Sequence, residues 1–388
     1  MTLLQGWLDS IVYIKISFML ANRLKTLNPY KPGEQLTDRK YIKLNANENP
    51  YAPPKEVAEA VSKLLDSNLK SLSLYPDPDS TDLREEIASF LNKTGGVLAN
   101  ISEAKEKLDF EITKDMIFCG NGSDEVLSFV FYAFFDDDKK VVTPEFSYSF
   151  YPVYAGYYGI ELEKVPLKHD FSLDTEKMLE YGKNSSGMIF ANPNAPTGIA
   201  LSTAEIKNML DNFPKNKVFV VDEAYADFGT ESVLGLLKEY KNLLVVRTFS
   251  KSISLAGMRI GFTVGNPELI KALTTVKNSF NHFPVDVICK TAAKAALQSY
   301  EYYEKITKEI VETREWFSSE LQKKGYSVIP SKTNFIFVKR AGIKGIDIYE
   351  QVKKAGLLIR HFATPGIENF VRVTIGTKEQ MTTLLEAM

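Results

Sequence analysis

The sequence predicts an α/β protein with a large domain built on a mostly parallel, doubly wound sheet, and a smaller α+β domain beside it. Between residues 116 and 264, short apolar runs of strand length alternate with segments of helical spacing. Such alternation is typical of parallel strands joined by helical crossovers. After Pro284, a long helical stretch and more widely spaced strands replace the pattern. A chain of 388 residues is long enough for two domains.

The elements of the large sheet can be placed in order. Strands are expected at 116–119, 141–142, 188–191, 217–221, 243–249 and 261–264. Helices are expected at 56–65, 82–91, 126–135 and 146–158, and Ser202 to Glu205 has the pattern of a capping box that opens another helix. Beyond residue 284 we expect a helical stretch at 292–324, a helix at 347–355 and strands near Ser327, Phe335 and Val371.

This order divides the chain into residues 1–45, 46–284 and 285–388, with the first segment returning to the smaller C-terminal domain. The first twenty residues are apolar, but Asp9 and Lys15 interrupt them and no basic n-region or cleavage site is present. A transmembrane helix is therefore not expected. We interpret this stretch as an extra amphipathic helix or an upstream translation start, with Met19 as the more natural beginning.

The composition is that of an ordinary globular enzyme, with 44% hydrophobic and 25% charged residues. A net charge of −2 gives no reason to expect nucleic acid or a membrane surface as a partner. Cys119 and Cys289 lie far apart in apolar surroundings, which favours reduced core thiols and a cytoplasmic location. The three histidines are scattered, so no metal site is expected.

The stretch from Leu243 to Val264 carries the strongest chemical signal. Ser250 and Lys251 follow a buried strand directly, and Arg259 comes eight residues later. A neutral lysine amine can form a Schiff base with a carbonyl cofactor, and an arginine fork can bind phosphate. Pyridoxal phosphate carries both groups. An isolated lysine and arginine after a strand are more often simply solvated, so the pattern needs support from the rest of the chain.

Other strand ends supply that support. Gly122, Ser123 and Asp124 lie between a strand and a helix, where backbone N–H groups can hold a phosphate, although Ser123 can also merely cap the helix. Asp222 ends an apolar strand, where a carboxylate is costly without a cationic partner such as a pyridinium nitrogen. In parallel sheets, ligands bind beyond these carboxyl ends.

Two aromatic residues complete the set of strand-end candidates. Tyr225, three residues after Asp222, could donate to a ring oxygen of the cofactor. Phe146 follows a strand and could stack on the cofactor ring, although aromatic residues in such positions more often belong to the core. The joint occurrence of these features at strand ends is far more specific than any one of them.

With these motifs in place, the sequence resembles the fold-type I pyridoxal-phosphate-dependent aminotransferases, and most closely the histidinol-phosphate aminotransferase group within them. The resemblance extends from about Leu24 to the C-terminus. The matching motifs are LNPYKPG, LNANENP, YPDP, GNGSDE, NPNAPTG, VVDEAYADF, RTFSKSISLAGMRIGF and VRVTIGT.

The resemblance implies a role for each candidate residue. Lys251 would bind pyridoxal 5′-phosphate covalently, Asp222 would pair with its ring nitrogen, and Tyr225 would contact its ring oxygen. The phosphate would be held by Gly122, Ser123, Asp124, Ser250 and Arg259, and by Tyr75 of a neighbouring subunit, which implies a homodimer. The side that binds the small-molecule amino and keto substrates would be lined by Tyr30, Asn47, Arg360 and Arg372.

The sequence departs from the family pattern at two positions. Family members usually have asparagine directly before Pro-Thr-Gly, where its amide meets the ring oxygen, whereas this chain has Ala195. Asn194 or Asn192 could take over that role, and Asn194 is the candidate. The ring-stacking position, often tyrosine in the family, is Phe146, so stacking would be kept without a phenolic hydrogen bond.

The expected reaction is transfer of an amino group between L-histidinol phosphate and 2-oxoglutarate, in histidine biosynthesis. An aromatic aminotransferase or a threonine-phosphate decarboxylase on the same fold remains an alternative, because the cofactor site is common to all of them. A transcription regulator is disfavoured, since the N-terminal stretch is too short and insufficiently basic for a DNA-binding module. A silent binding protein is disfavoured because Lys251, Asp222, Tyr225 and Arg259 are all retained.

Overall fold

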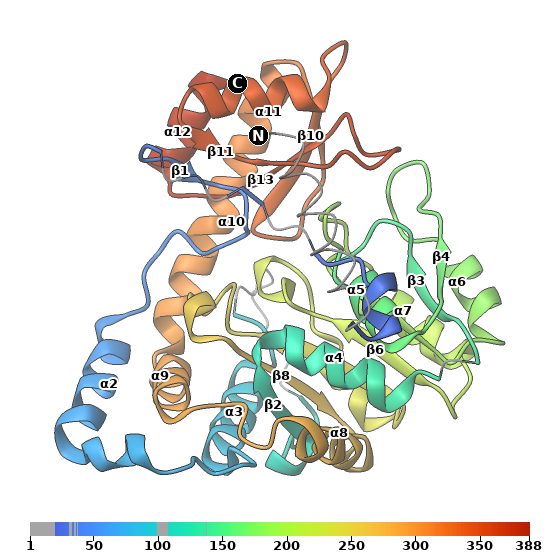
Figure 1. Ribbon diagram of the computed structural model, residues 1–388. Helices are drawn as coiled ribbons and strands as arrows, with labels where there is room; N and C mark the ends of the chain where they lie inside the picture. The colour runs from blue at the N-terminus through green and yellow to red at the C-terminus, as the bar shows by residue number, and fades with distance from the viewer. Residues whose placement is uncertain (1–19, 31–32, 35, 37, 99–107, 137) are drawn as a thin grey trace, which may run out of the picture.

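The computed structural model describes residues 20–388 except 31–32, 35, 37, 99–107 and 137. Within these residues the main sheet has seven strands in the order β2-β8-β7-β6-β5-β3-β4 (Figure 1). They are β2 (Ile117–Asn121), β3 (Val141–Pro144), β4 (Leu162–Val165), β5 (Gly187–Ala191), β6 (Val218–Asp222), β7 (Leu243–Thr248) and β8 (Ile260–Gly265). Since β8 is antiparallel to its neighbours and the other pairs are parallel, the prediction of a mostly parallel sheet is confirmed.

Helices cover both faces of this sheet because alternate strand residues enter different cores. In β7, Leu243 and Val245 join the core beneath α3 (Thr81–Thr94), α7 (Thr203–Asn212) and α9 (Val287–Gln298). Leu244 and Val246 point the other way, into the core beneath α4 (Gly122–Phe134), α5 (Tyr151–Tyr158) and α8 (Pro267–Phe280). The sheet is therefore doubly wound, as predicted. Two further helices are α2 (Lys55–Asn68) and α6 (Thr175–Gly182).

A second, antiparallel sheet forms the upper part of the molecule in Figure 1. Its order is β12-β13-β10-β9, and the strands are β9 (Tyr326–Ile329), β10 (Phe335–Arg340), β12 (Arg360–His361) and β13 (Val371–Thr374). It packs with α10 (Tyr300–Lys323), α11 (Gly345–Lys354) and α12 (Lys378–Ala387) around a core of its own.

Two residues of the N-terminal segment pair with a strand of this part of the chain. Strand β1 (Ile42–Lys43) pairs in parallel with β11 (Leu357–Leu358). Short 3₁₀ segments connect the larger elements at Asn22–Thr26, Leu69–Ser73, Lys114–Met116, Ala226–Phe228, Val233–Lys238 and Ala256–Met258. The domain boundaries at residues 45 and 284 stay predictions.

Several elements differ from the predicted ones. The helix expected at 146–158 begins at Tyr151, where Pro152 suits a first helical turn, and 146–150 form a loop. The stretch expected at 292–324 is two helices, α9 and α10, separated at Ser299. Strands β1, β4, β11 and β12 and helices α6, α8 and α12 were not predicted. The predicted amphipathic helix lies largely outside the described residues. No helix of the described part is long and apolar enough to span a membrane.

Candidate active site

The carboxyl ends of β2, β5, β6 and β7 lie at one edge of the main sheet and surround a small cavity, here called the inner compartment. Its volume is about 90 Å³. Its lining is Ser123, Asp124, Tyr148, Ala191, Ala195, Asp222, Ala224, Tyr225, Thr248, Ser250, Lys251 and Arg259. The structure thus brings together the strand-end side chains that the sequence singled out, although they are up to 136 positions apart.

A second cavity of about 280 Å³ adjoins the first and is here called the outer compartment. Tyr148, Ala195, Tyr225 and Lys251 line both compartments. The predicted substrate-side residues Tyr30, Asn47, Arg360 and Arg372 all lie in the outer one. Lys251 therefore stands at the junction between the two predicted binding regions.

Two glycines make the floor of the inner compartment possible. Gly122 has φ +79°, and a Cβ there would lie 2.6 Å from Nη2 of Arg259. A Cβ on Gly261 would lie 2.2 Å from the backbone nitrogen of Ser123. Glycine alone lets β8 and the first turn of α4 approach each other this closely. The N–H groups at the start of α4 are consequently next to the Arg259 guanidinium, which is a suitable arrangement for an anion.

Asp124 contributes differently from the prediction of a direct phosphate ligand. Its Oδ2 pairs with Nη2 of Arg259 at 2.8 Å, and its Oδ1 accepts from the hydroxyls of Tyr148 at 2.7 Å and Tyr154 at 3.3 Å. A carboxylate repels phosphate, so this side chain orients Arg259, and only the backbone N–H of Asp124 is suited to bind an anion. Arg259 also donates to Oγ of Ser250 at 3.5 Å.

Asp222 is the buried charge of the inner compartment. It is 4% exposed at the end of β6, and it accepts from the hydroxyl of Tyr151 at 2.9 Å and from the backbone N–H of Ala224 at 3.1 Å. No lysine or arginine of the described chain pairs with it. Burial raises the pKa of Asp222 to about 6, against the smaller opposing effect of these hydrogen bonds. A cationic group bound in the compartment would compensate the carboxylate.

Lys251 has no carboxylate partner among the described residues. Its Nζ donates to the backbone oxygen of Ala46 at 3.4 Å and lies 5.6 Å from the centre of the Tyr225 ring. The Tyr225 hydroxyl accepts from Nδ2 of Asn47 at 2.8 Å. An amine that is free of ion pairs at the junction of two cavities is accessible to a carbonyl group in either one.

Tyr148, and not Phe146, lines the inner compartment, which corrects the predicted position of the stacking ring. Phe146 packs instead against the cluster of Phe337, Ile367 and Phe370. Hydrogen bonds in the loop cause this difference, because the backbone oxygen of Phe146 accepts from Nδ2 of Asn194 at 2.8 Å. The sequence did contain the signal, since a second aromatic residue follows Phe146 two positions later.

The same hydrogen bonds argue against Asn194 as a ring-oxygen ligand. Its side chain is fully buried, donates to Oγ1 of Thr197 as well as to Phe146, and accepts from Ser147. The side chain of the other candidate, Asn192, donates to the backbone oxygen of Leu201 and accepts from its backbone N–H. Neither asparagine lines either compartment, whereas Ala195 lines both. The structure therefore places no side-chain amide from this loop toward the cofactor region.

Arg360 and Arg372 meet across strands β12 and β13, where they are direct Cα partners. Like charges in such positions repel each other unless an anion lies between them. Arg372 donates to the backbone oxygen of Asn45 at 3.3 Å, and its Nε has no hydrogen-bond partner in the described structure. Burial, together with the charge of Arg360, lowers the pKa of Arg372. No carboxylate of the described residues neutralises Arg372, which favours a bound anion over an internal ion pair.

Tyr75 lies outside both compartments of its own chain. Its side chain is 83% exposed and stacks on Phe283, with ring centres 4.5 Å apart. The turn that follows is held firmly, since the buried Lys277 donates to the backbone oxygen of Pro78 at 2.6 Å and pairs with Asp79 at 3.2 Å. Tyr75 is therefore exposed beside a turn that is anchored to α8.

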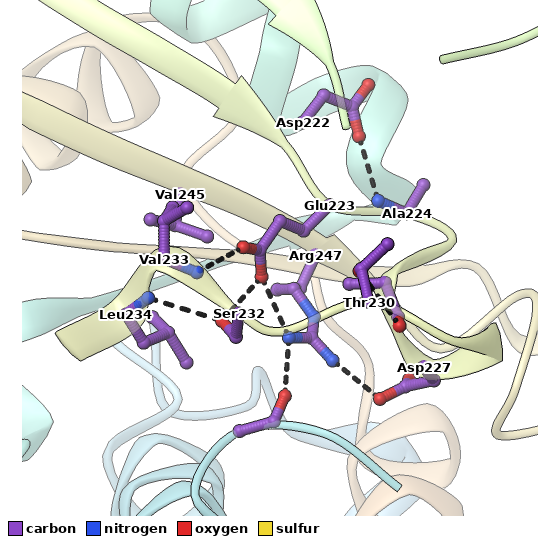
Figure 2. Close-up of polar contacts among 12 residues, drawn as sticks. Asp222, Glu223, Ala224, Asp227, Thr230, Ser232, Val233, Leu234, Val245 and Arg247 are labelled. Atoms are coloured by element: carbon purple, nitrogen blue, oxygen red, sulfur yellow. Dashed lines mark hydrogen bonds and ion pairs between the residues drawn. The ribbon is translucent and has the colours of Figure 1, made fainter. Parts of the chain in front are cut away.

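Sequence reasoning missed a buried ionic network beneath the site, shown in Figure 2. Arg247 of β7 pairs with Glu223 at 3.0 Å and Asp227 at 2.9 Å, and donates to the backbone oxygen of Gly96 at 2.6 Å. Asp227 also accepts from the hydroxyl of Ser252, the residue after Lys251. The network therefore connects Glu223 and Asp227, which follow Asp222, to Ser252, which follows Lys251. Arg247 within an apolar strand and Glu223 beside Asp222 were the available signals.

The chemistry of these donors fits pyridoxal phosphate. The inner compartment offers an uncompensated buried carboxylate, an amine free of ion pairs, and a glycine-lined helix start beside an arginine. These groups match the ring nitrogen, the aldehyde and the phosphate of the cofactor. The described residues contain no cluster of His, Cys, Asp or Glu that could hold a metal ion.

Comparisons with known proteins agree with this chemistry. The family described as Aminotransferase class I and II matches residues 39–388. A histidinol-phosphate aminotransferase of Syntrophus aciditrophicus is 48% identical over 372 residues, covering 95% of this chain and 97% of the relative. One of Clostridium acetobutylicum is 44% identical over 364 residues, covering 94% and 96%.

Solved structures show the same fold. The crystal structure of histidinol-phosphate aminotransferase from Sinorhizobium meliloti, in complex with pyridoxal-5′-phosphate, has a TM-score of 0.79 at 23% identity and covers 95% of this chain and 96% of that one. Aspartate aminotransferase from Thermus thermophilus with maleate has a TM-score of 0.78 at 19% identity, covering 95% and 98%. The chain belongs to the class I and II aminotransferases, and within them to the family of the histidinol-phosphate aminotransferases.

Proposed function

We propose that this enzyme transfers the amino group between L-histidinol phosphate and 2-oxoglutarate, a reaction of histidine biosynthesis, with pyridoxal phosphate in the inner compartment. The observation that carries the proposal is the position of Lys251. Lys251 lines both compartments. The inner one contains the buried carboxylate of Asp222, and the outer one is lined by Arg360 and Arg372, which face each other across β12 and β13. The relatives at 48% and 44% identity bear the name of this reaction's amino donor.

Each part of the inner compartment would hold one part of the cofactor. Lys251 would bind the aldehyde carbon, and Asp222 would keep a proton on the ring nitrogen. Arg259, Ser250 and the N–H groups of Ser123 and its neighbours would bind the phosphate. The ring of Tyr148 would pack against the cofactor ring, in the place that the sequence suggested for Phe146.

The residues at the junction would then carry out the proton transfer. When bound, the cofactor supplies an electron-withdrawing ring that stabilises negative charge on the substrate carbon losing its proton. Lys251, whose amine lies at the junction, would be the base that takes this proton and returns it to a different carbon. Asp222 favours the protonated ring throughout, since its carboxylate is buried without another cation.

The outer compartment would select the substrates by their negative charge. Arg360 and Arg372 can form forked hydrogen bonds with the phosphate of L-histidinol phosphate and with a carboxylate of 2-oxoglutarate. Tyr30 and Asn47 line the same cavity and would contact the substrate from the N-terminal segment. One pair of arginines would thus serve both half-reactions, in which the two substrates occupy the site in turn.

Replacing Arg372 by alanine is expected to lower kcat/KM for both substrates by about 100-fold or more, because each loses a buried charged contact. Arg340→Ala is a matched control, since this arginine ends β10 and lies in neither compartment. Each half-reaction is followed separately by the absorbance of the cofactor. A loss confined to the half-reaction of histidinol phosphate would show that the two substrates do not share Arg372.

We also propose that the enzyme acts as a homodimer in which Tyr75 completes the site of the partner. The support is that Tyr75 is exposed while its ring stacks on Phe283, and that exposed apolar side chains precede it in the chain. Leu69, Leu72 and Leu74, which precede Tyr75 in the chain, are also exposed, at 65%, 48% and 61%.

Mixing Lys251→Ala subunits with Tyr75→Ala subunits tests this arrangement. Each hybrid dimer should contain one site with an intact lysine and an intact tyrosine from the other chain, so activity should reappear on mixing. Tyr132→Ala, which alters another exposed tyrosine, should keep full activity alone. If Tyr75 served its own chain, neither hybrid site would be intact, and no activity would return despite demonstrated subunit exchange.

A further inference from the structure

The hydroxyl of Tyr225 has one hydrogen-bonding direction that the protein leaves open. It accepts from Nδ2 of Asn47 at 2.8 Å, in a place where Tyr225 is 6% exposed. An oxygen that accepts from this amide still has its own hydrogen to donate. No acceptor for this hydrogen is found among the described residues around Tyr225, a residue that lines both compartments. The hydrogen is therefore available to a group bound in the cavity.

The orientation of Asn47 is fixed from the small sheet. Oγ1 of Thr374, at the end of β13, accepts from the backbone N–H of Asn47 at 3.0 Å and donates to its Oδ1 at 3.1 Å. Because Oδ1 takes the hydrogen of Thr374, the atom that faces Tyr225 is the donor Nδ2. Nδ2 of Asn334 holds the backbone oxygen of Asn47 at 3.0 Å, so the residue is anchored on three sides. Asn47 is 1% exposed and has φ +55°, a conformation that asparagine tolerates.

The other three residues that line both compartments cannot donate a hydroxyl hydrogen to a bound molecule in place of Tyr225. Tyr148 already gives its hydroxyl hydrogen to Asp124 at 2.7 Å, and Ala195 has no polar side chain. Lys251 is the amine that binds the aldehyde in the proposed function. Among the described residues that line both compartments, only Tyr225 thus has a hydroxyl hydrogen that it can donate to a bound molecule.

We propose that Asn47, held by Thr374, is a positioning residue that directs the hydroxyl hydrogen of Tyr225 to the ring oxygen of the cofactor. The inference rests on the proposed function, because it requires pyridoxal phosphate in the inner compartment. Arg372 and Thr374 are two residues apart on β13 and so lie on the same face of the strand. The strand that carries the substrate-binding arginine therefore also sets the hydrogen bond made to the cofactor.

Visible absorbance of the bound cofactor, titrated with pH, tests the proposal apart from activity. A donated hydrogen bond stabilises the anionic form of the ring oxygen and so keeps the apparent pKa of the chromophore low. Asn47→Gly removes the side chain and suits the positive φ, and it should raise that apparent pKa by about 0.5 to 1 unit. Thr374→Val should raise it in the same direction, whereas Thr374→Ser keeps the hydroxyl and should leave it unchanged.

The charged groups around the chromophore stay the same in all these variants. They are Asp124, Asp222, Lys251 and Arg259 at the inner compartment and Glu34, Lys43, Arg360 and Arg372 at the outer one. The shift can therefore be assigned to the hydrogen bonds. Ala195→Asn, which adds an amide at another residue that lines both compartments, should lower the apparent pKa.

The decisive comparison is made in the background of Tyr225→Phe, which lacks the hydroxyl. If Asn47 acts through Tyr225, then Asn47→Gly causes no further shift in this background. Equal shifts in both backgrounds, or an unchanged pKa in Asn47→Gly protein that binds cofactor, would overturn the inference and leave the proposed function intact. Wild-type protein that shows no visible band with pyridoxal phosphate would overturn both.

Discussion

Lys251→Ala is expected to lower turnover by at least about 10⁴-fold while the protein stays folded, since both covalent binding of the cofactor and proton transfer depend on this amine. The fold should be kept because Lys251 makes no ion pair among the described residues and borders a cavity. The free energy of unfolding should therefore change little.

Borohydride reduction provides the direct measurement for this variant. Wild-type protein should gain the mass of the reduced cofactor on the peptide that contains Lys251, and the alanine variant should gain none. Lys251→Arg is the matched control, because it keeps the positive charge but cannot bind the aldehyde, and it should be as inactive as the alanine variant. Substantial turnover in either variant would remove Lys251 from the reaction.

Asp222→Asn is expected to slow the half-reactions by about 10² to 10³-fold, because asparagine cannot hold the proton on the ring nitrogen by its charge. The side chain keeps nearly the same size and can still accept from Tyr151 and from the N–H of Ala224. A rate near that of the wild type would mean that the carboxylate serves the fold alone.

Although Asp222→Asn should slow the reaction, it should increase the stability of the cofactor-free protein. The pKa of Asp222 is raised to about 6 by burial, so the folded protein retains a proton that the unfolded chain has already lost at lower pH. As pH rises from about 4 through 6, ionisation of Asp222 destabilises the folded state, by up to about 3 kcal/mol. Cofactor-free Asp222→Asn should therefore be more stable than the wild type at pH 8, and the difference should shrink toward pH 5.

Denaturant unfolding of both proteins across this pH range measures the difference. Binding of the cofactor should remove it, since the ring nitrogen then compensates the carboxylate. A difference that does not depend on pH would show that Asp222 is ionised at little cost in the free protein.

Much of the fold and of the site could be predicted from the sequence, for physical reasons. Apolar runs such as Leu243–Val246 can be recognised as strands because strands buried on both faces contain few polar residues. Asp222 and Lys251 could be found because parallel strands place their carboxyl ends at one edge of the sheet. The roles assigned to the individual residues depend on the resemblance, because strand order alone does not say what a bound molecule would contact.

The remaining features depend on contacts between distant parts of the chain. The choice between Phe146 and Tyr148 is set by the hydrogen bonds of Asn194 to the loop, which no local pattern reveals. The hydrogen bond from Asn47 to Tyr225 joins residues 178 positions apart. Helix α8, which holds the turn after Tyr75 through Lys277, was missed although Asn266 and Pro267 mark its start as an N-cap and a first helical residue.

The central claim is that Lys251 transfers the amino group of L-histidinol phosphate, and a half-reaction of the wild-type enzyme tests it most directly. Enzyme loaded with pyridoxal phosphate is mixed with L-histidinol phosphate, phenylalanine, tyrosine or phosphothreonine, and conversion of the cofactor to its amino form is followed by absorbance. We expect the largest second-order rate constant for L-histidinol phosphate, with recovery of the original spectrum on addition of 2-oxoglutarate. Faster conversion by phenylalanine or tyrosine, or release of carbon dioxide from phosphothreonine, would contradict the claim.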